Sequence, residues 1–426
     1  MKKVLIITYY WTPAGGPGVQ RWLKFVKYLR DFNIEPIIYI PENPTYPIID
    51  ENIGNDLPKN ITILKKKIIE PYTFASLFSK EKTKKISAGI IPSKQLNWLD
   101  KLFLWVRGNI FIPDARILWV KPSVKYLEKY ITDNQIDTII TTAPPHSVHL
   151  IGKELKKRLN IRWIADFRDP WTNIGYHSEL RLTKKSAKKH YDLEKSVLQT
   201  ADSILVTSPT TKKEFEEKTR QPITLITNGF DDDSFKNIRT SDKFLVSHIG
   251  SLLTERNPKT LWRVLNELIL ENKDFANDFQ LCLAGKISDE VISDLKTYNL
   301  YQYTDFKGYI SHNDAIELQH YSQVLLLLEI NHEKTQGIIP GKLFEYMASS
   351  RPILAIGYKD WDAGEIIKET NTGKVLAAED YQNIKKVILN YYELYKKGEL
   401  FINSQKINPY HRKELTRKLS ELLLRH

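Results

Sequence analysis

The residues with the clearest chemical potential lie late in the chain, in a Gly/Pro loop that leads into a short helix and then a strand. Gly337–Glu345 reads GIIPGKLFE, and Arg351-Pro352 follows shortly after. Backbone amides at the start of a helix, together with the Lys342 ammonium, can neutralise a diphosphate. Glu345 lies one turn further on the same helix face, where a carboxylate can accept hydrogen bonds from two ribose hydroxyls. The alternative is an ordinary amphipathic helix with a solvated Lys–Glu pair.

A second candidate site is the glycine-rich loop near the start of the chain. Thr12–Arg21 reads TPAGGPGVQR and separates an expected strand from an expected helix. Glycines such as Gly16 let the backbone approach a ligand closely, and the helix start offers N–H groups to an anion. The loop is neither a GxGxxG pattern nor a Walker loop, because no Gly-Lys-Ser/Thr follows. A tight turn between strand and helix is the alternative.

Two further segments place polar groups directly after apolar strands. Thr141–His149 (TTAPPHSVH) opens a helix that Ser147 or His146 could cap, and His146 could instead supply an imidazole for hydrogen bonding and proton transfer. Asp166–Trp171 (DFRDPW) carries three charges at a strand end, which is costly unless a ligand or a network compensates them. We therefore expect His146 and Asp169 to be catalytic residues. A structural pair between Asp169 and Arg168 is the alternative for the second segment.

The strands that position these segments are short β-branched runs that alternate with amphipathic helical patterns. They are expected at Val4–Thr8, Pro36–Ile40, Asp137–Thr142, Arg162–Phe167, Ser203–Ser208, Ile223–Asn228, Phe244–Gly250, Gln280–Gly285, Asp305–Tyr309, Val324–Ile330 and Pro352–Gly357. Alternating apolar strands and helices are typical of parallel sheets covered on both faces. The sequence therefore predicts an α/β protein with two doubly wound, Rossmann-like domains facing each other across a cleft, where such folds bind ligands.

The domain limits follow from a polar segment without periodicity at Asp231–Lys243. We expect an N-terminal domain over residues 1–235, with an insertion at about 42–120 that is rich in Pro, Lys and aromatic residues. A C-terminal domain is expected over residues 236–405. The last helix, within residues 406–426, is basic like the N-terminal half and is expected to pack back on the N-terminal domain.

The bulk composition is that of a soluble globular chain, because 42% of its 426 residues are hydrophobic and 27% are charged. A single cysteine, Cys282, excludes a disulfide framework and a cysteine-rich metal site. The start of the chain does not read as a secretory signal, and no run approaches the roughly 20 apolar residues of a membrane helix. The net charge is +12 and its basic excess lies in the N-terminal half and the tail. Such a surface suits anionic membranes, phosphorylated acceptors or nucleic acid, although a merely solvated basic face explains it as well.

Taken in order, these motifs resemble the family 4 retaining glycosyltransferases of the GT-B fold. The likeness covers nearly the whole chain and also includes Asn228–Asp231 (NGFD), His248–Ser251 (HIGS) followed by Arg256, and Leu283–Lys286 (LAGK). The PPHS and DFRDPW elements are similar to those of the branch found in bacterial surface-polysaccharide clusters. The resemblance implies an enzyme that transfers a sugar, with retention, from a UDP- or GDP-linked donor to a glycan or lipid-linked acceptor. The N-terminal domain would then hold the acceptor and the C-terminal domain the nucleotide sugar.

The resemblance also assigns the donor site. The donor-binding residues would be Gly16, Arg256, Ile339, Pro340, Gly341, Lys342 and Glu345. Arg256 would contact the donor diphosphate and Glu345 the ribose, and the loop ending at Lys342 would hold the distal phosphate and the sugar.

Three positions depart from the family pattern. Gly337 stands where the family often has a carboxylate eight positions before the ribose-binding glutamate, and Glu333 is the candidate replacement. The usual histidine of the family aligns with Thr142, which makes His146 a displaced candidate. Lys259 is available for the second cation of the diphosphate pair.

No cofactor and no metal are expected, because the family needs none and the run Asp231–Asp233 lies in the presumed linker. The leaving phosphate would be stabilised by Arg256, Lys342 and helix amides. We expect a cytoplasmic protein that binds peripherally to the inner face of the plasma membrane. Trp98–Val120, aided by Trp22 on the first helix, combines aromatic and basic residues suited to an anionic bilayer. The alternative is that these aromatic residues form the core of the insertion.

Two other function classes stay open at this point. A sugar-nucleotide epimerase would share the two-domain shape but would act on the donor without an acceptor. A nucleic-acid-binding protein is suggested by the charge alone. No known reader motif supports it, and the acidic C-terminal half argues against a uniformly basic surface. We therefore expect no nucleic-acid partner.

Overall fold

The computed structural model describes residues 1–51, 53–54, 57–70, 98–173, 180–232 and 239–425. The chain forms two compact units. Unit 1 comprises Met1–Asn228 together with Arg412–His426, and unit 2 comprises Gly229–His411. The first crossing between the units therefore falls a few residues before the boundary expected at residue 235. The second returns the last helix to the first unit.

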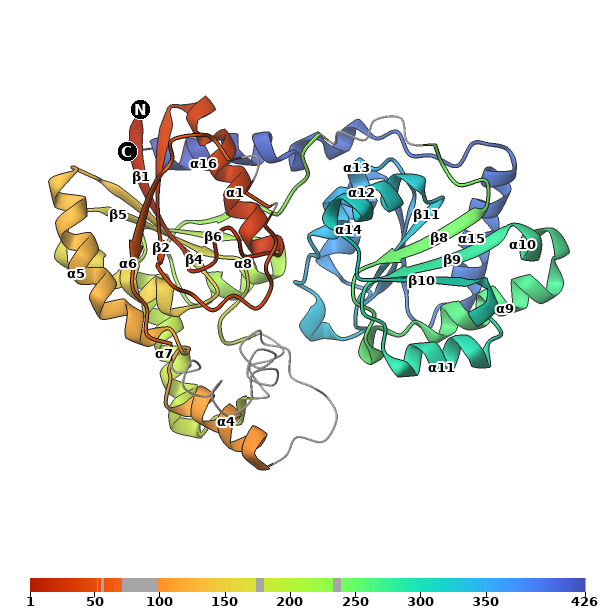
Figure 1. Ribbon diagram of the computed structural model, residues 1–426, viewed down its shortest axis with the longest axis horizontal. Coiled ribbons are helices and arrows are strands. Elements are labelled where there is room, and N and C mark those ends of the chain that lie inside the picture. Colours follow the sequence, from red (N-terminus) through yellow and green to blue (C-terminus); the bar gives the residue numbers. More distant parts are fainter. Residues whose placement is uncertain (52, 55–56, 71–97, 174–179, 233–238, 426) are drawn as a thin grey trace. The chain divides into compact units, whose positions relative to one another are not determined.

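The sheet of unit 1 has seven parallel strands in the order β3-β2-β1-β4-β5-β6-β7 (Figure 1). Its strands are β1 (Lys2–Ile7), β2 (Ile34–Pro41), β3 (Thr62–Lys66), β4 (Thr138–Ala143), β5 (Arg162–Phe167), β6 (Ser203–Val206) and β7 (Ile223–Leu225). The predicted α/β fold with parallel sheets is confirmed. The segment expected as an insertion is partly built into this sheet, because β3 pairs with β2 at its edge.

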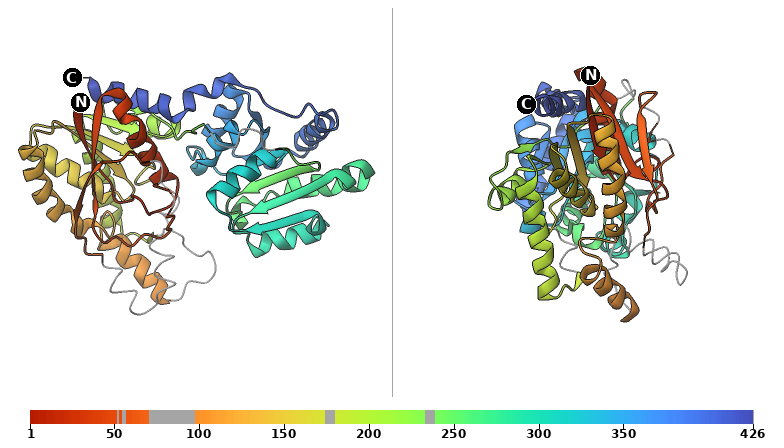
Figure 2. Two further views of the ribbon diagram at one scale, coloured as in Figure 1. Left: turned by 45° about the horizontal axis from the view of Figure 1, so that its top comes forward. Right: turned by 90° about the vertical axis from the view of Figure 1, so that its left-hand side faces the viewer.

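Helices cover both faces of this sheet. The helices of unit 1 are α1 (Pro17–Leu29), α4 (Trp98–Asn109), α5 (Ile117–Asp133), α6 (Ser147–Arg158), α7 (Lys184–Thr200), α8 (Pro209–Glu216) and α16 (Arg412–Leu424), of which α4 lies away from the sheet (Figure 1). Figure 1 and the left view of Figure 2 show α16 beside α1. Leu419 and Leu423 of α16 are buried in the same core as the strands, and Lys413 Nζ lies 2.8 Å from Asp31 Oδ2.

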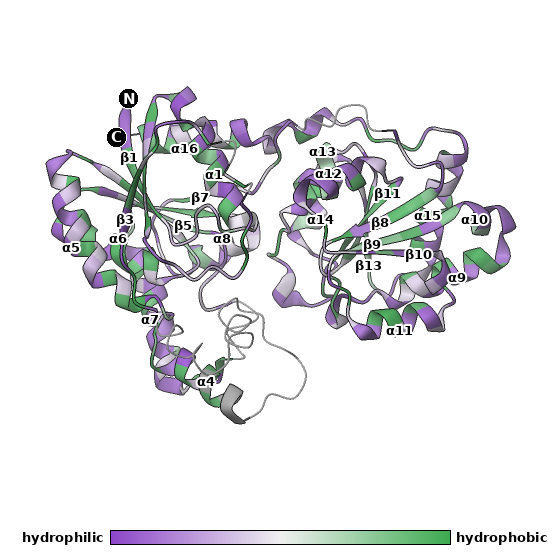
Figure 3. Cartoon of the chain, in the orientation of Figure 1, coloured by the Kyte–Doolittle hydropathy of each residue, from purple (hydrophilic) through white to green (hydrophobic). Residues whose placement is uncertain are grey.

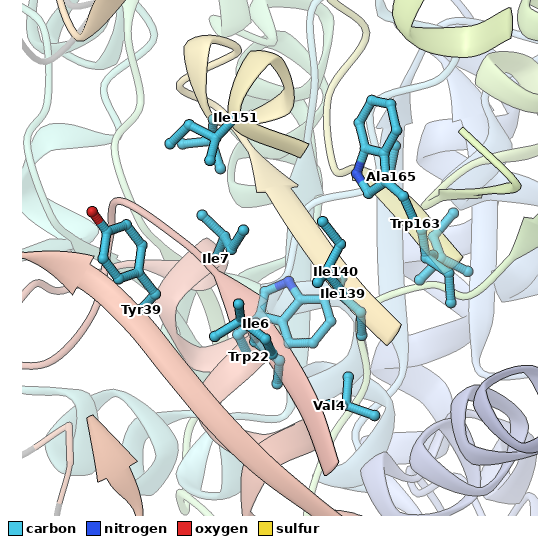
Figure 4. Close-up of a cluster of buried hydrophobic side chains, with 14 of the residues drawn as sticks. Val4, Ile6, Ile7, Trp22, Tyr39, Ile139, Ile140, Ile151, Trp163 and Ala165 are labelled. Atoms are coloured by element: carbon cyan, nitrogen blue, oxygen red, sulfur yellow. The ribbon is translucent and has the colours of Figure 1, made fainter. Parts of the chain in front are cut away.

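The core of unit 1 follows from strands that are apolar on both faces (Figure 4). Val4 and Ile6 point to one side of β1, and Leu5 and Ile7 point to the other, because side chains alternate along a strand. All four have no exposed surface. Such strands are stable only when helices cover both faces, which the α1 and α6 layers do here.

Unit 2 repeats the plan with six parallel strands in the order β10-β9-β8-β11-β12-β13. They are β8 (Phe244–Ile249), β9 (Phe279–Ala284), β10 (Thr304–Gly308), β11 (Val324–Leu328), β12 (Ile353–Gly357) and β13 (Gly373–Ala377). The helices are α9 (Lys259–Glu271), α10 (Lys273–Asp278), α11 (Asp289–Thr297), α12 (His312–Tyr321), α13 (Lys342–Ala348), α14 (Asp362–Thr370) and α15 (Tyr381–Lys396).

Alternate residues of the central strands of unit 2 enter two separate cores. Leu326 and Leu328 of β11 pack with α9 and α15, whereas Leu325 and Leu327 pack with α13 and α14. Figure 3 shows the result, with mainly hydrophobic strands between helices of mixed polarity. The helices therefore keep their polar sides for solvent, and ligand-binding groups are expected at the strand ends, in the loops and in the first turns of helices.

A buried carboxylate joins three elements of unit 1. Asp166, at the end of β5, accepts hydrogen bonds from Arg21 Nη2 at 3.1 Å and from Trp22 Nε1 and Thr142 Oγ1 at 2.8 Å each. The side chains of Arg21 and Asp166 are 1% and 0% exposed. Arg21 also donates to the carbonyl oxygen of Thr227 at 2.7 Å. Of the three charged residues in the DFRDPW segment, Asp166 therefore has a structural role.

Replacing Asp166 with alanine is expected to lower the free energy of unfolding by about 3–5 kcal/mol, because the Arg21 guanidinium would stay buried without its counter-charge. Urea unfolding followed by tryptophan fluorescence measures the change. Asp169→Ala is the matched control and should cost no more than about 1 kcal/mol, since its pair with Arg168 is solvent-exposed. Equal losses in both variants would contradict the structural role of Asp166.

Candidate functional site

The carboxyl end of β8 in unit 2 is held by the short helix α13. Tyr346 Oη accepts a hydrogen bond from the Ile249 amide at 3.1 Å, and Lys342 Nζ donates to the Ile249 carbonyl at 2.9 Å. Gly250 follows with a φ of 131°. A Cβ atom at Gly250 would lie 2.6 Å from Lys342 Nζ, so only glycine lets the ammonium reach this position.

Arg256 lies beside this strand end, in the short 3-10 helix η3 (Thr254–Arg256). It forms a bidentate ion pair with Glu329, with Nε–Oε1 at 2.8 Å and Nη2–Oε2 at 3.2 Å. Glu329 follows β11 directly, and its Oε1 also accepts the Ile330 amide at 2.9 Å. The Glu329 side chain is 1% exposed and that of Arg256 is 32% exposed, so the pair presents its cationic side to solvent.

Lys342 completes a cluster that we call the Arg256–Lys342 cluster: Arg256, Lys342 and Glu329. Burial, reinforced by the positive charge of Arg256, lowers the pKa of Lys342 to about 8, while Glu329 and Glu345 act in the opposite direction. Arg256 is paired with Glu329, whereas the Lys342 ammonium is held by the Ile249 carbonyl and has no ion-pair partner among the described residues. An oxyanion such as a diphosphate would supply the missing negative charge, and charge-assisted hydrogen bonds of this kind are the strong ones.

Glu345 lies one turn after Lys342 on α13, on the side that the core does not take. Leu343, Phe344 and Met347 are buried, whereas the Glu345 side chain keeps 18% of its surface exposed. Its Oε2 accepts from Gln319 Nε2 at 3.3 Å, and its Oε1 lies 3.8 Å from His312 Nε2. A carboxylate held in this way is ready to accept hydrogen bonds from vicinal hydroxyls.

The loop before α13 closes directly onto the helix. Pro340 accepts from the Leu343 amide at 3.0 Å, and Gly341, which caps the helix, accepts from the Phe344 amide at 3.3 Å. Ile339 packs against the core shared by α13 and α14. These hydrogen bonds fix the backbone of Pro340 and Gly341 at the start of the helix that carries Lys342.

The two residues considered as substitutes at the donor site belong to other elements than the cluster. Lys259 starts α9 and pairs with Glu290 at 3.1 Å and Asp294 at 3.4 Å. Glu333 lies exposed in the 3-10 helix η5 (Glu333–Thr335). The carboxylate that does contact Arg256 is Glu329. The sequence feature that could have identified Glu329 is its position as the single charged residue at the end of the apolar run VLLLLEI.

In unit 1 the glycine-rich loop meets the DFRDPW segment. Gly16 caps α1 with a φ of 109°, and no atom lies within 4 Å of a Cβ placed there. At Gly18 a Cβ would lie 1.2 Å from Arg168 Nη1, so the guanidinium lies directly over the first turn of α1. Arg168 also pairs with Asp169, at 3.2 Å between Nη2 and Oδ2. The Asp169 side chain keeps 40% of its surface exposed.

His146 immediately precedes α6 and is 5% exposed. Its ring stacks on Trp171, with 4.9 Å between centroids and 7° between the planes. Asp114 caps the helix beside it by accepting from the Ser147 amide and hydroxyl at 2.8 Å each. His146 is therefore not the side chain that caps this helix.

The neighbouring His149 is committed to the core. It is fully buried, and its Nδ1 lies 2.8 Å from Thr141 Oγ1. Burial lowers its pKa to about 3, so the ring is neutral at physiological pH. The DFRDPW loop is fixed from α7, because Glu194 accepts from the Trp171 amide at 3.1 Å and from Thr172 Oγ1 at 2.7 Å.

Within the described part of the chain, no group of three or more His, Cys, Asp or Glu side chains is arranged to hold a metal ion. In the same residues, no helix is both long and apolar enough to span a membrane.

Comparison with known families and structures identifies the two halves of the chain. The model described as Glycosyltransferase Family 4 matches residues 92–234, and the model described as Glycosyl transferases group 1 matches residues 229–407. No curated protein matches the chain by sequence.

Among solved structures, the chain is similar to Anabaena HepE in complex with UDP, at 14% identity and a TM-score of 0.63 over 99% of both chains. It is also similar to sucrose-phosphate synthase from Thermosynechococcus elongatus, at 14% identity and a TM-score of 0.62 over 99% of this chain and 98% of that one. TarM of S. aureus, in complex with Fondaparinux, alpha-GlcNAc-glycerol and UDP, gives 13% identity and a TM-score of 0.61 over 100% of both chains. At this identity the structures establish the fold, and the family models establish the class. The chain belongs to the GT-B glycosyltransferases of the family 4 and group 1 type.

Proposed function

We propose that this glycosyltransferase moves a sugar, with retention of configuration, from a UDP- or GDP-linked donor to a glycan or lipid-linked acceptor in the synthesis of a cell-surface polysaccharide. The Arg256–Lys342 cluster carries the proposal. It places the Arg256–Glu329 pair and the Lys342 ammonium at the carboxyl ends of β8 and β11, which is where ligands bind in open α/β sheets. Retention and the surface-polysaccharide pathway rest on the motif resemblance.

Each part of the donor has a matching group in unit 2. The diphosphate fits Arg256 and Lys342, and the ribose fits the Glu345 carboxylate one turn further along α13. The loop Ile339–Gly341 would lie against the distal phosphate and the sugar. As the bond to the sugar breaks, negative charge grows on the leaving phosphate, and two fixed cations stabilise it without a metal ion or another cofactor.

Unit 1 would bind the acceptor and supply the catalytic groups. Asp169 is the more accessible candidate, because Arg168 fixes its carboxylate while much of its surface stays exposed. His146 follows β4 at the carboxyl edge of the sheet, and its stacking on Trp171 fixes the ring plane. We propose both as catalytic residues.

Two helices of unit 1 form a surface suited to a bilayer. The exposed apolar side chains on or beside α4 are Leu102, Trp105 and Ile110. The start of α7 adds four exposed lysines, Lys184, Lys185, Lys188 and Lys189. The helices are linked by the Thr183 amide, which donates to Asn109 Oδ1 at 2.8 Å, and by Asn109 Nδ2, which donates to the Arg181 carbonyl at 3.3 Å. Apolar anchors beside lysines favour anionic lipid.

This α4–α7 surface modifies the docking surface expected from the sequence. The prediction that Trp22 contacts the membrane was wrong, because this residue is 1% exposed and donates its indole N–H to Asp166. The side chains of Trp98, Lys101 and Phe103 lie outside what the structure describes. We propose that the protein is cytoplasmic and binds the inner face of the plasma membrane through the α4–α7 surface, close to a lipid-linked acceptor.

Alanine at Arg256 or at Lys342 is expected to weaken UDP or GDP binding by about tenfold or more, because each removes a charged hydrogen bond worth roughly 1.5–3 kcal/mol. Glu345→Ala should weaken the free nucleoside as well, since its partner is ribose. Isothermal titration calorimetry measures the affinities. Lys259→Ala is the matched control, because that cation is paired elsewhere and should leave affinity unchanged. Unchanged binding in both Arg256 and Lys342 variants would refute the donor site.

A separate assay distinguishes transfer from epimerisation. A transferase should release nucleoside diphosphate only when an acceptor is added.

Nucleoside-diphosphate affinity should fall as the pH rises through about 8. The free protein holds Lys342 protonated below this pKa and neutral above it, and the bound diphosphate requires the charged form. Binding at pH 8–9 should therefore take up a proton, which calorimetry in buffers of different ionisation enthalpy detects. Lys342→Arg should abolish the uptake. A pH-independent affinity between pH 7 and 9 would mean that Lys342 does not meet the ligand.

Cosedimentation with liposomes tests the membrane proposal. The protein should pellet with vesicles containing anionic lipid at low salt, pellet less at high salt, and stay in solution with neutral vesicles. Leu102→Ser combined with Trp105→Ser should reduce the bound fraction several-fold. Tyr309→Ser removes an aromatic residue that is 88% exposed in unit 2 and is the control. Equal binding by the two variants, or no binding by the parent protein, would overturn the α4–α7 surface.

A further inference from the structure

A cavity of about 540 Å³ opens in unit 2 at the amino ends of the strands. Four residues that line it lie just before neighbouring strands: Asp278 before β9, Asp242 before β8, Gln323 before β11 and Arg351 before β12. The Arg256–Lys342 cluster lies at the opposite edge of the same sheet. A strand of six residues such as β8 is roughly 20 Å long, so the cavity is separate from the donor residues.

Arg351 is the residue in this cavity that lacks a counter-charge. Its Nε is shielded from solvent and has no hydrogen-bond partner, and no carboxylate within the described ranges pairs with its guanidinium. Burial lowers its pKa, with no carboxylate acting in the opposite direction. A partly buried cation without a partner is costly, and a ligand that supplies negative charge removes that cost.

The two carboxylates that line the cavity are already paired. Asp278 accepts from Lys396 Nζ at 3.2 Å and from Tyr392 Oη at 2.8 Å. Asp242 accepts from Arg239 Nη2 at 2.8 Å on both oxygens. Since these carboxylates have their own cations, neither is available to Arg351, and neither leaves the cavity acidic.

Gln323 and Tyr395 are likewise occupied with backbone oxygens. Gln323 Nε2 donates to the Ser241 carbonyl at 2.8 Å, and Tyr395 Oη donates to the Asp242 carbonyl at 2.6 Å. Leu400 and Phe401 form an apolar side of the cavity: Leu400 is buried and Phe401 is 62% exposed. The cavity therefore combines one unpaired guanidinium with an apolar side.

We propose that this cavity is a second ligand site that binds an oxyanion through Arg351. The chemical class that fits is a phosphate group, either free or as the ester of a small molecule. Guanidinium binds phosphate in bidentate fashion, and the volume lies within the range of small-molecule sites. In an ester, the organic part would lie against Leu400 and Phe401. The site is distinct from the proposed donor site and does not depend on it.

Calorimetric titration of the full-length protein with inorganic phosphate, and in a second arm with glycerol 3-phosphate, tests the proposal. The parent protein should bind at least one of the two probes. Arg351→Met should weaken that binding by about tenfold or more, because it removes a charged hydrogen-bond donor. Both titrations are made with the donor site saturated with UDP or GDP, and Lys259→Met, which removes a cation that does not line the cavity, should leave the binding unchanged. Tighter binding of the ester than of phosphate would assign a role to the apolar wall, and equal binding would assign the affinity to the phosphate group alone.

Thermal unfolding provides an independent measurement. In phosphate-free buffer Arg351→Met should unfold at the same or a higher temperature than the parent, because it removes an uncompensated cation. With UDP or GDP saturating the donor site, phosphate should then raise the Tm of the parent and of Lys259→Met, but not that of Arg351→Met. A marked loss of Tm in Arg351→Met would show that the arginine has a structural partner and would overturn the proposal. So would failure of both probes to bind, or binding that is lost only in Lys259→Met.

Discussion

Both units depend on an ion pair between a buried carboxylate and an arginine at the carboxyl edge of the sheet. Asp166 holds Arg21 in unit 1, and Glu329 holds Arg256 in unit 2. The two pairs differ in the exposure of the arginine. Arg21 is buried and its charge is neutralised by Asp166, whereas Arg256 keeps about a third of its side-chain surface exposed to solvent. The same interaction thus fixes the architecture in one unit and prepares a binding surface in the other.

Helix α13 shows how little structure is needed to assemble such a surface. Its seven residues bury Leu343, Phe344 and Met347, and they satisfy both backbone groups of Ile249 through Tyr346 and Lys342. Glu345 is left on the outer side. Packing, backbone hydrogen bonding and ligand chemistry therefore use different faces of about two helical turns, so a change on one face also shifts the groups on the others.

Most of the fold could be predicted from the sequence because buried parallel strands are continuous apolar runs. The exceptions have physical causes. β3 (TILKK) is a largely exposed edge strand, and β13 (GKVLA) is an edge strand with no fully buried residue, so neither gives that signal. Arg256, Lys342 and Glu345 could be named because their motifs are local. Glu329 and Trp22 could not be assigned, because their roles depend on Arg256 and Asp166, partners that lie far away in the chain.

The position of α16 has a consequence for the order in which the protein is made. This helix buries Leu415, Leu419 and Leu423 in the core of unit 1, yet it is encoded after the whole of unit 2. During translation, unit 2 can therefore complete its core while the first unit still exposes the apolar groove on which α16 packs. Since exposed apolar surface in a nascent chain promotes misfolding and aggregation, the first half of this chain has the longer period of dependence on chaperones, although it leaves the ribosome first.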